Sequence, residues 1–250
     1  MSGHSKWATI KRSKGKADAA RGRIFNRLIR EITVAARMGG GDINANARLR
    51  SAVTSARTQN MPGKNIDNAI LKGTGKLEGV SYEDVSFEGY GPGGVAILIE
   101  CMSDNRNRTV AEVRHILTKH GGNLGQTNSV AWMFKSKGII MVPKEGITED
   151  QLMEIVLEAG ADDLSSEGEE YEITTTFEAF EPVRHALEKA NIKPSSAEIT
   201  KVGENPVQLE GDNASKVIKL VDALDELDDT QHVYANFDVS AETMANLEKE

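Results

Sequence analysis

The spacing of apolar residues changes near Gly75, and this change separates two parts of the chain that must fold differently. Before Gly75, apolar side chains recur every three or four residues, which is typical of amphipathic helices. After it, short strand-like runs alternate with helical segments. A chain of 250 residues is expected to hold two or three domains, and this one is predicted to belong to the α+β class.

The first part predicts three helices, over residues 17–38, 44–60 and 62–73. Three glycines follow the first helix, where the left-handed conformation that ends a helix is tolerated. Asp42 or Asn44 is the expected cap of the second helix, and Pro62 suits the first turn of the third. We therefore expect a small helical bundle, preceded by a basic arm at residues 1–16.

The second part contains a ferredoxin-like pattern flanked by further strands and helices. The order β-α-β-β-α-β is predicted for residues 138–142, 149–159, 163–167, 170–176, 182–190 and 197–202. Before it we expect strands at 85–88, 95–101 and 129–134 and a helix at 109–120, and after it a helix at 214–227 and a strand at 232–237. These flanking segments lack partners of their own, so we expect them to meet in a second sandwich.

The predicted organisation is thus an N-terminal three-helix domain plus two ferredoxin-like α+β sandwich domains, one inserted in the other. The arm and helical domain occupy 1–76, and the discontinuous sandwich occupies 77–135 and 206–240. The inserted sandwich occupies 136–205, and a helical tail is expected at 241–250.

Charge is divided unequally along the chain. Residues 1–76 hold 16 Lys and Arg against four Asp and Glu, a net charge of +12, whereas residues 77–250 hold 14 against 34, a net charge of −20. Such asymmetry indicates a part that contacts a polyanion joined to a part that does not, because cations that face solvent bind phosphates by releasing counterions. The alternative is that the basic helices dock on the acidic domains of the same chain.

The first helix is predicted to bury one face and to present Arg23, Arg27, Arg30 and Arg37 as a stripe on the other. We expect phosphate contacts from the arm and the three helices, through Lys6, Lys11, Arg12, Lys14, Lys16, Arg21, Arg23, Arg27, Arg30, Arg37, Arg50, Arg57 and Lys64. Phosphate contacts do not read sequence, so contacts to base edges would need other side chains on the second and third helices. Arg48, Arg50, Arg57, Gln59, Asn60 and Lys64 are the candidates.

The segment Asp104-Asn-Arg-Asn-Arg-Thr109 joins a predicted strand to a predicted helix. Arg106 and Arg108 could bind a phosphate or a carbonyl group of a partner. Equally, the segment could form a capping and turn network inside the protein, with Thr109 as the helix cap. The sequence leaves both interpretations open.

Motifs for catalysis and for cofactors are weak. Gly89-x-Gly91-x-x-Gly94 matches a dinucleotide fingerprint by letters, but Pro92 lacks an N–H and a strand follows, which favours a simple turn. No metal-ligand spacing involves the five histidines, and Cys101 has no recognisable base nearby. We therefore expect a non-enzymatic protein with no metal, cofactor or small-molecule substrate. No apolar run reaches bilayer length, and a single cysteine suits a reducing compartment, so a cytoplasmic location is expected.

Several motifs together closely resemble the YebC/PmpR family. They are Gly3-His-Ser-Lys-Trp-Ala8, Ile10-Lys11, Met61-Pro62, Gly89-Tyr-Gly-Pro92, Gly94-Val-Ala96, Asp104-Asn-Arg-Asn-Arg-Thr109, Gly121-Gly122, Leu124-Gly125 and Ser129-Val130. The resemblance covers nearly the whole chain and implies a helical domain plus two α+β domains. The family offers no catalytic residues, and its motif positions here include the cations Lys6, Lys11, Arg106 and Arg108.

The resemblance implies a polyanionic partner but leaves its kind open. Bacterial members of the family are described as transcriptional regulators that bind promoter DNA. A mitochondrial relative activates translation of a cytochrome oxidase messenger, and bacterial members are also described as ribosome-associated factors. We therefore expect a DNA-binding transcriptional regulator, with an rRNA- or mRNA-bound translation factor as the alternative.

Overall fold

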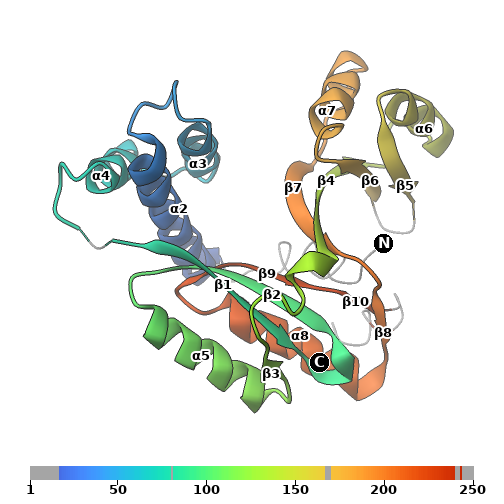
Figure 1. Ribbon diagram of the computed structural model, residues 1–250. Coiled ribbons are helices and arrows are strands. Elements are labelled where there is room, and N and C mark those ends of the chain that lie inside the picture. The colour runs from blue at the N-terminus through green and yellow to red at the C-terminus, as the bar shows by residue number, and fades with distance from the viewer. Residues whose placement is uncertain (1–16, 80, 167–169, 240–242, 244–250) are drawn as a thin grey trace.

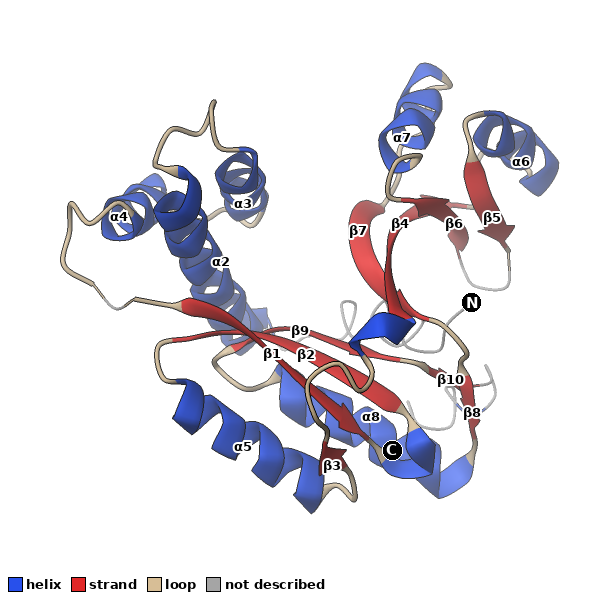
Figure 2. Cartoon of the chain, in the orientation of Figure 1, coloured by secondary structure: helices blue, strands red, loops and turns tan. Residues whose placement is uncertain are grey.

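The computed structural model describes residues 17–79, 81–166, 170–239 and 243. The described residues form a helical bundle, two four-stranded sheets that each have helices on one face, and a small two-stranded sheet (Figure 1). We call the four-stranded sheets the central sheet and the second sheet. The bundle and the second sheet stand on the same side of the central sheet (Figure 1), and the secondary structure of each unit is coloured in Figure 2. The fold class is α+β, as the sequence predicted.

The helical bundle consists of α2 (Ala17–Gly39), α3 (Ala47–Thr58) and α4 (Gly63–Gly73). Its core unites apolar residues of all three helices with Met61 from the turn that joins α3 to α4. All three predicted helices are confirmed, but the second begins later than expected. Its cap is Asn46, whose side chain accepts a hydrogen bond from the Leu49 N–H while donating to the carbonyl oxygens of Ala35 and Gly40. Asn46 is preferred because it also fixes the end of α2.

The central sheet has the strand order β3-β1-β2-β9 and is antiparallel throughout. Its strands are β1 (Glu83–Tyr90), β2 (Ala96–Ser103), β3 (Asn123–Leu124) and β9 (Thr230–Ala235). Helices α5 (Arg106–Lys119) and α8 (Gly211–Asp225) cover one face (Figure 1). As expected, the chain leaves this sheet and returns to it, because β9 pairs with β2 after the whole second sheet has been built. Residues after β9 continue into β10 (Phe237–Val239), which pairs in parallel with β8 (Val207–Leu209).

The second sheet follows the predicted β-α-β-β-α-β order. Its elements are β4 (Phe134–Pro143), α6 (Glu149–Glu158), β5 (Ala161–Ser165), β6 (Glu170–Thr176), α7 (Phe180–Lys189) and β7 (Ser196–Gly203). The strand order β5-β6-β4-β7, antiparallel throughout, is that of a ferredoxin-like sandwich. Helices α6 and α7 supply the core on one face, against Ile140 and Ile173 of the two middle strands.

The strand predicted at residues 129–134 is wrong. A short 3-10 helix, η2 (Ala131–Met133), lies there, and β4 begins only at Phe134. The reason is the buried side chain of Glu88 in β1, which accepts hydrogen bonds from the backbone N–H groups of Asn128, Val130 and Ala131. Although burial by itself raises the pKa of Glu88, these bonds outweigh that effect and lower it. A backbone whose donors point at one carboxylate cannot use them for strand pairing.

Two smaller differences concern helix ends. Helix α5 begins at Arg106 rather than Thr109, because Asn105 and not Thr109 is its cap. The predicted tail at 241–250 lies outside the described residues except for Thr243. The division of the chain into four sequence segments stays a prediction.

We predict that Gly73→Ala destabilises the bundle. A Cβ at Gly73 would lie 2.3 Å from the Thr33 carbonyl oxygen and 2.8 Å from the Ala36 Cβ, because α4 ends against the backbone of α2. Overpacking of this kind costs about 1 to 3 kcal/mol. The free energy of unfolding in urea measures it. Gly63→Ala is the matched control, since a Cβ there meets nothing within 4 Å and should leave stability equal or slightly higher. Equal stabilities for the two variants would contradict the close approach.

Candidate nucleic-acid interface

The exposed side of α3 and α4 carries cations that pair with no acidic side chain of the described residues. Arg57, Lys64, Lys72 and Lys76 are exposed. Arg50 is exposed too, and its guanidinium donates to the carbonyl oxygens of Ile43 and Asn44, which fixes its direction. Helix α3 contains no acidic residue, and α4 contains only Asp67. This surface therefore remains positive in the folded protein.

The four arginines predicted as one stripe on the first helix have different surroundings. Arg23 and Arg37 are exposed, and Arg37 donates to the Ser81 hydroxyl. Arg27 instead binds the Asp225 carboxylate at the end of α8, with 3.1 Å between Nη2 and Oδ1. Arg30 binds Asp229. The expectation of a single solvent-facing stripe is wrong for Arg27 and Arg30, because Asp225 of α8 and Asp229, directly before β9, lie beside that side of α2.

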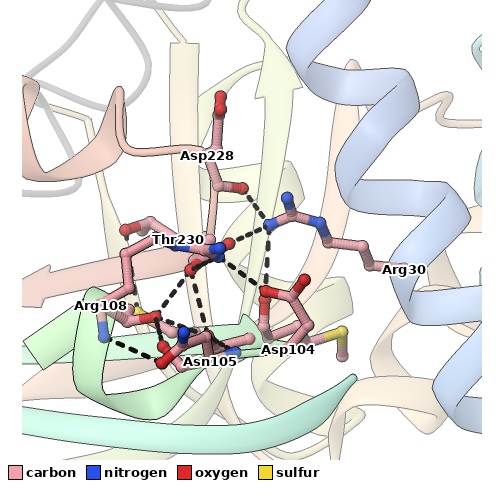
Figure 3. Close-up of polar contacts among 11 residues, drawn as sticks. Arg30, Asp104, Asn105, Arg108, Asp228 and Thr230 are labelled. Carbon is pink, nitrogen blue, oxygen red and sulfur yellow. Dashed lines mark hydrogen bonds and ion pairs between the residues drawn. The ribbon is translucent and has the colours of Figure 1, made fainter. Parts of the chain in front are cut away.

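Arg30 is the more deeply buried of these two arginines. Its guanidinium lies 3.0 Å from the Asp229 carboxylate and 3.3 Å from the Met102 carbonyl oxygen, and it also donates to the Asp228 carbonyl. The Tyr82 ring packs against it, with its centroid 5.2 Å from Cζ. Groups from three separate segments thus surround one arginine of the bundle. Figure 3 shows Arg30 reaching from α2 toward this group.

Asp229 is the centre of this contact, and its side chain is only 2% exposed. Its Oδ2 accepts hydrogen bonds from the hydroxyls of Ser103 at 3.1 Å and Thr109 at 2.6 Å. The same oxygen lies 2.7 Å from Nη2 of Arg108, which approaches from the first turn of α5. We call Asp229, Arg30, Arg108, Ser103 and Thr109 the Asp229 cluster.

The cluster keeps Asp229 ionised. Burial alone would raise its pKa, but hydrogen bonds from Thr109 and Arg108 and the charges of Arg30 and Arg108 hold the pKa below its usual range. The charge of Arg108 is fixed in return, since its hydrogen bonds to Asp229 and Asp104 raise the pKa of the guanidinium. A buried carboxylate with several donors holds the segments that supply them in one arrangement.

The segment from Asp104 to Thr109 is mainly an internal network. Asn105 caps α5 by accepting a hydrogen bond from the Arg108 N–H, and its own N–H donates to the Ser103 hydroxyl. Arg108 is bound to Asp104 and Asp229, so the interpretation of Arg108 as a partner-binding residue is not favoured. Arg106 is exposed and has no ion pair with the described residues, so it stays a candidate for a partner contact.

One further candidate has an internal partner. Arg48, a predicted base-reading residue, binds Glu31 of α2 through two nitrogens at 2.7 and 3.0 Å and also reaches Asp84. The hydrogen bonds to Glu31 above all raise the pKa of this guanidinium. Arg48 therefore fastens α3 to α2 and to β1, whereas Gln59 and Asn60 are exposed in the following turn.

The remaining predicted contacts cannot be placed. Lys6, Lys11, Arg12, Lys14 and Lys16 lie outside the described residues, and of Arg21 only the helical backbone is described.

The glycine motif at 89–94 forms the turn between β1 and β2, as predicted. Burial raises the pKa of the Cys101 thiol to about 12, which makes it a poor nucleophile. Among the described residues, no group of three His, Cys, Asp or Glu side chains could hold a metal ion. No helix in the described part of the chain is long and apolar enough to span a bilayer.

Comparison with known proteins matches both parts of the chain to one family. Residues 5–76 match the TACO1/YebC protein N-terminal domain, and residues 82–237 match the TACO1/YebC second and third domain. The chain belongs to the TACO1/YebC family. A probable transcriptional regulatory protein of Geobacter sulfurreducens is 57% identical over 99% of this chain and 100% of its own length. One of Chlorobaculum tepidum is 53% identical over the full length of both.

A solved structure supports the same assignment to the TACO1/YebC family. It is that of a conserved hypothetical protein from Aquifex aeolicus, which is 47% identical to this chain with a TM-score of 0.77. The match covers 90% of this chain and 93% of the other. The fold described above is therefore the fold of a family whose curated relatives are named as probable transcriptional regulatory proteins.

Sequence reasoning missed Asp229 and Glu88 as structural centres of this TACO1/YebC chain. Asp229 lies in the acidic run Asp225–Asp229, where a solvent-exposed turn is the usual interpretation. Its partners lie 120 or more positions away in the sequence, so no local spacing could reveal them. The signal available was the Arg-rich motif at 104–109, for which an internal capping and turn network was one of the two interpretations left open.

We predict that Asp229→Asn lowers the free energy of unfolding by about 3 kcal/mol or more, because two arginines lose a buried carboxylate. Chemical denaturation at pH 7 measures the loss. Asp104→Asn is the matched control: it also bonds Arg108, at 2.7 Å, but its side chain is 29% exposed. Exposed pairs contribute only about 0 to 1 kcal/mol, so this variant should stay close to the parent protein.

The same pair of variants tests the ionisation of Asp229. A carboxylate whose folded pKa is depressed stabilises the protein above its unfolded pKa of about 3.9, and the contribution is lost as pH falls through the folded pKa. The stability difference between the parent protein and Asp229→Asn should therefore shrink as pH is lowered from 7 to about 3. A difference that stays constant over this range would show that folding does not lower the pKa of Asp229.

Proposed function

We propose that this chain is a nucleic-acid-binding regulatory protein that contacts phosphates through its helical bundle, with duplex DNA as the partner. The observation that carries the proposal is the surface of α3 and α4, where Arg50, Arg57, Lys64 and Lys72 face solvent without acidic partners among the described residues. Cations in this state attract phosphates, and the gain comes from released counterions.

The internal ion pairs reduce the set of cations that a phosphate could reach. Arg27, Arg30 and Arg48 are already bound to acidic groups, so a phosphate would have to replace a carboxylate to reach them. The exposed cations lie instead on α3, on α4 and at Arg23 and Arg37 of α2. We therefore assign phosphate contacts to these residues, together with the arm at 1–16, which carries five cations and no acidic residue.

The choice of DNA rests on the relatives, which are named as probable transcriptional regulatory proteins. A protein that acts on transcription must distinguish its own duplex sites from the rest of the genome. Gln59 and Asn60, which are exposed between α3 and α4, offer groups that can hydrogen-bond base edges. A single buried cysteine without a disulfide suits action in the cytoplasm.

We predict that Arg57→Gln and Lys64→Gln weaken nucleic-acid binding about equally for all sequences. Each lost phosphate contact should reduce the slope of log K against log salt by about 1. Fluorescence anisotropy with a labelled duplex, between low and physiological salt, measures both effects. Lys193→Gln, on the second sheet's side of the molecule, is the matched control and should bind as the parent protein does.

The same assay decides between duplex DNA and RNA. Selected duplexes should bind at least about 10³-fold more tightly than random duplexes at physiological salt. Equal affinity for all duplexes, combined with tighter binding to structured RNA, would refute the DNA assignment and favour a translation factor. A salt slope unchanged by either substitution would show that the bundle is not the interface.

A further inference from the structure

The second sheet has a face that no described helix or strand covers, yet side chains on it are buried. Helices α6 and α7 cover the face that carries Ile140 and Ile173. Strand neighbours alternate between faces, so Ile139 and Met141 of β4 point to the opposite side. They are nevertheless only 8% and 9% exposed. Adjacent strands shield the flanks of such side chains but leave their ends open to solvent.

Acidic side chains flank these apolar residues on the neighbouring strands, and Lys137, which precedes Ile139 on the same face of β4, is paired with Asp162. Glu172 is paired with Met141 across the β4–β6 ladder, and Glu198 is paired with Ile139 across the β4–β7 ladder. Asp163 of β5 lies opposite Thr174, on the same face. Glu172 is only 5% exposed, although a carboxylate is buried only where cations or hydrogen-bond donors meet it. We call the face formed by Ile139, Met141, Glu172, Glu198 and Asp163 the acidic sheet face.

Charges of α2 and of the acidic sheet face both act on one residue of β9. Residue His232 of β9 interacts electrostatically with Arg27 of α2 and also with Glu198. Lys201 of β7 binds Glu100 of β2 and lies 5.8 Å above the Tyr234 ring, which joins the second sheet to the central sheet at the same place.

We propose that the acidic sheet face is the docking surface for residues 1–16 of the same chain. This segment carries Lys6, Lys11, Arg12, Lys14 and Lys16 and no acidic residue, so its charge is complementary to that of the face. It enters α2 at Ala17, and Arg27 is only about 15 Å further along the helix axis. Sixteen extended residues reach about 50 Å, which is ample. The apolar residues Trp7 and Ile10 can cover Ile139 and Met141.

Docking of the arm would give the acidic part of the chain a function. A basic arm held on its own protein is kept from polyanions that bind without specificity, and a nucleic acid must compete with the acidic sheet face for it. The inference does not rest on the proposed function, because docking of the arm requires no nucleic acid. The experiments below therefore contain none.

The first experiment is zero-length carbodiimide crosslinking of the full chain, followed by peptide mass spectrometry. We expect links from lysines of residues 1–16 to Glu172, Glu198 or Asp163. The Lys201–Glu100 pair, present in the structure, is the internal standard for the yield. Formation of the standard without arm links overturns the proposal. A mixture of light and heavy isotope-labelled protein distinguishes links within one molecule from links between two molecules. If every arm link joined a light to a heavy peptide, the arm on this face would belong to a second copy of the chain.

The second experiment measures oxidation of Met141 by peroxide, since accessible methionines react faster. A full-length variant with Lys11, Arg12, Lys14 and Lys16 changed to Gln should release the arm and increase the rate at Met141 several-fold. The matched control changes Arg57, Lys64, Lys72 and Lys76 to Gln and should leave it unchanged. Met38, 69% exposed, and Met61, 5% exposed, mark the fast and slow limits in each sample. Equal rates at Met141 in the two variants overturn the proposal.

Discussion

The carboxylate of Asp229 joins the helical bundle to the central sheet. It binds Arg30 of α2, Arg108 and Thr109 of α5, and the Ser103 hydroxyl at the end of β2, so three elements meet at one charge. The main chain contributes as well, because the Met102 N–H donates to the Asp229 carbonyl at 2.8 Å. Without an ionised group at this position, two guanidinium groups would face each other across the contact. The position of the bundle relative to the rest of the molecule follows from this arrangement.

This arrangement changes how the charge of the chain should be understood. The net charge of +12 over residues 1–76 overstates the positive charge that this part shows to solvent, because Arg27, Arg30 and Arg48 bind Asp225, Asp229 and Asp84, which lie outside that range. Some arginines of these helices thus bind the acidic part of the chain, whereas other arginines of the same helices face solvent. The exposed cations that pair with no acidic side chain of the described residues lie on α3, on α4 and at Arg23 and Arg37.

Local sequence patterns predicted the helices and strands well, but they did not reveal contacts between residues that are distant in the sequence. Apolar spacing located α2, α3 and α4 and the β-α-β-β-α-β order, because each is set by neighbours within a few residues. The same spacing suggested a strand at 129–134, where Glu88, some 40 positions away, takes the backbone N–H groups. Helical periodicity placed Arg27 and Arg30 away from the bundle core correctly, but it could not show that Asp225 and Asp229 lie on that side.

The central claim is that Arg30 and Asp229 form a coupled pair that fastens the bundle to the central sheet. A double-mutant cycle with Arg30→Gln and Asp229→Asn, read out as free energy of unfolding at pH 7, tests it most directly. Residues in one buried network show coupling energies of about 0.5 to 3 kcal/mol, and we expect a value in the upper half of that range. Additive effects of the two substitutions, with a coupling energy near zero, would contradict the account.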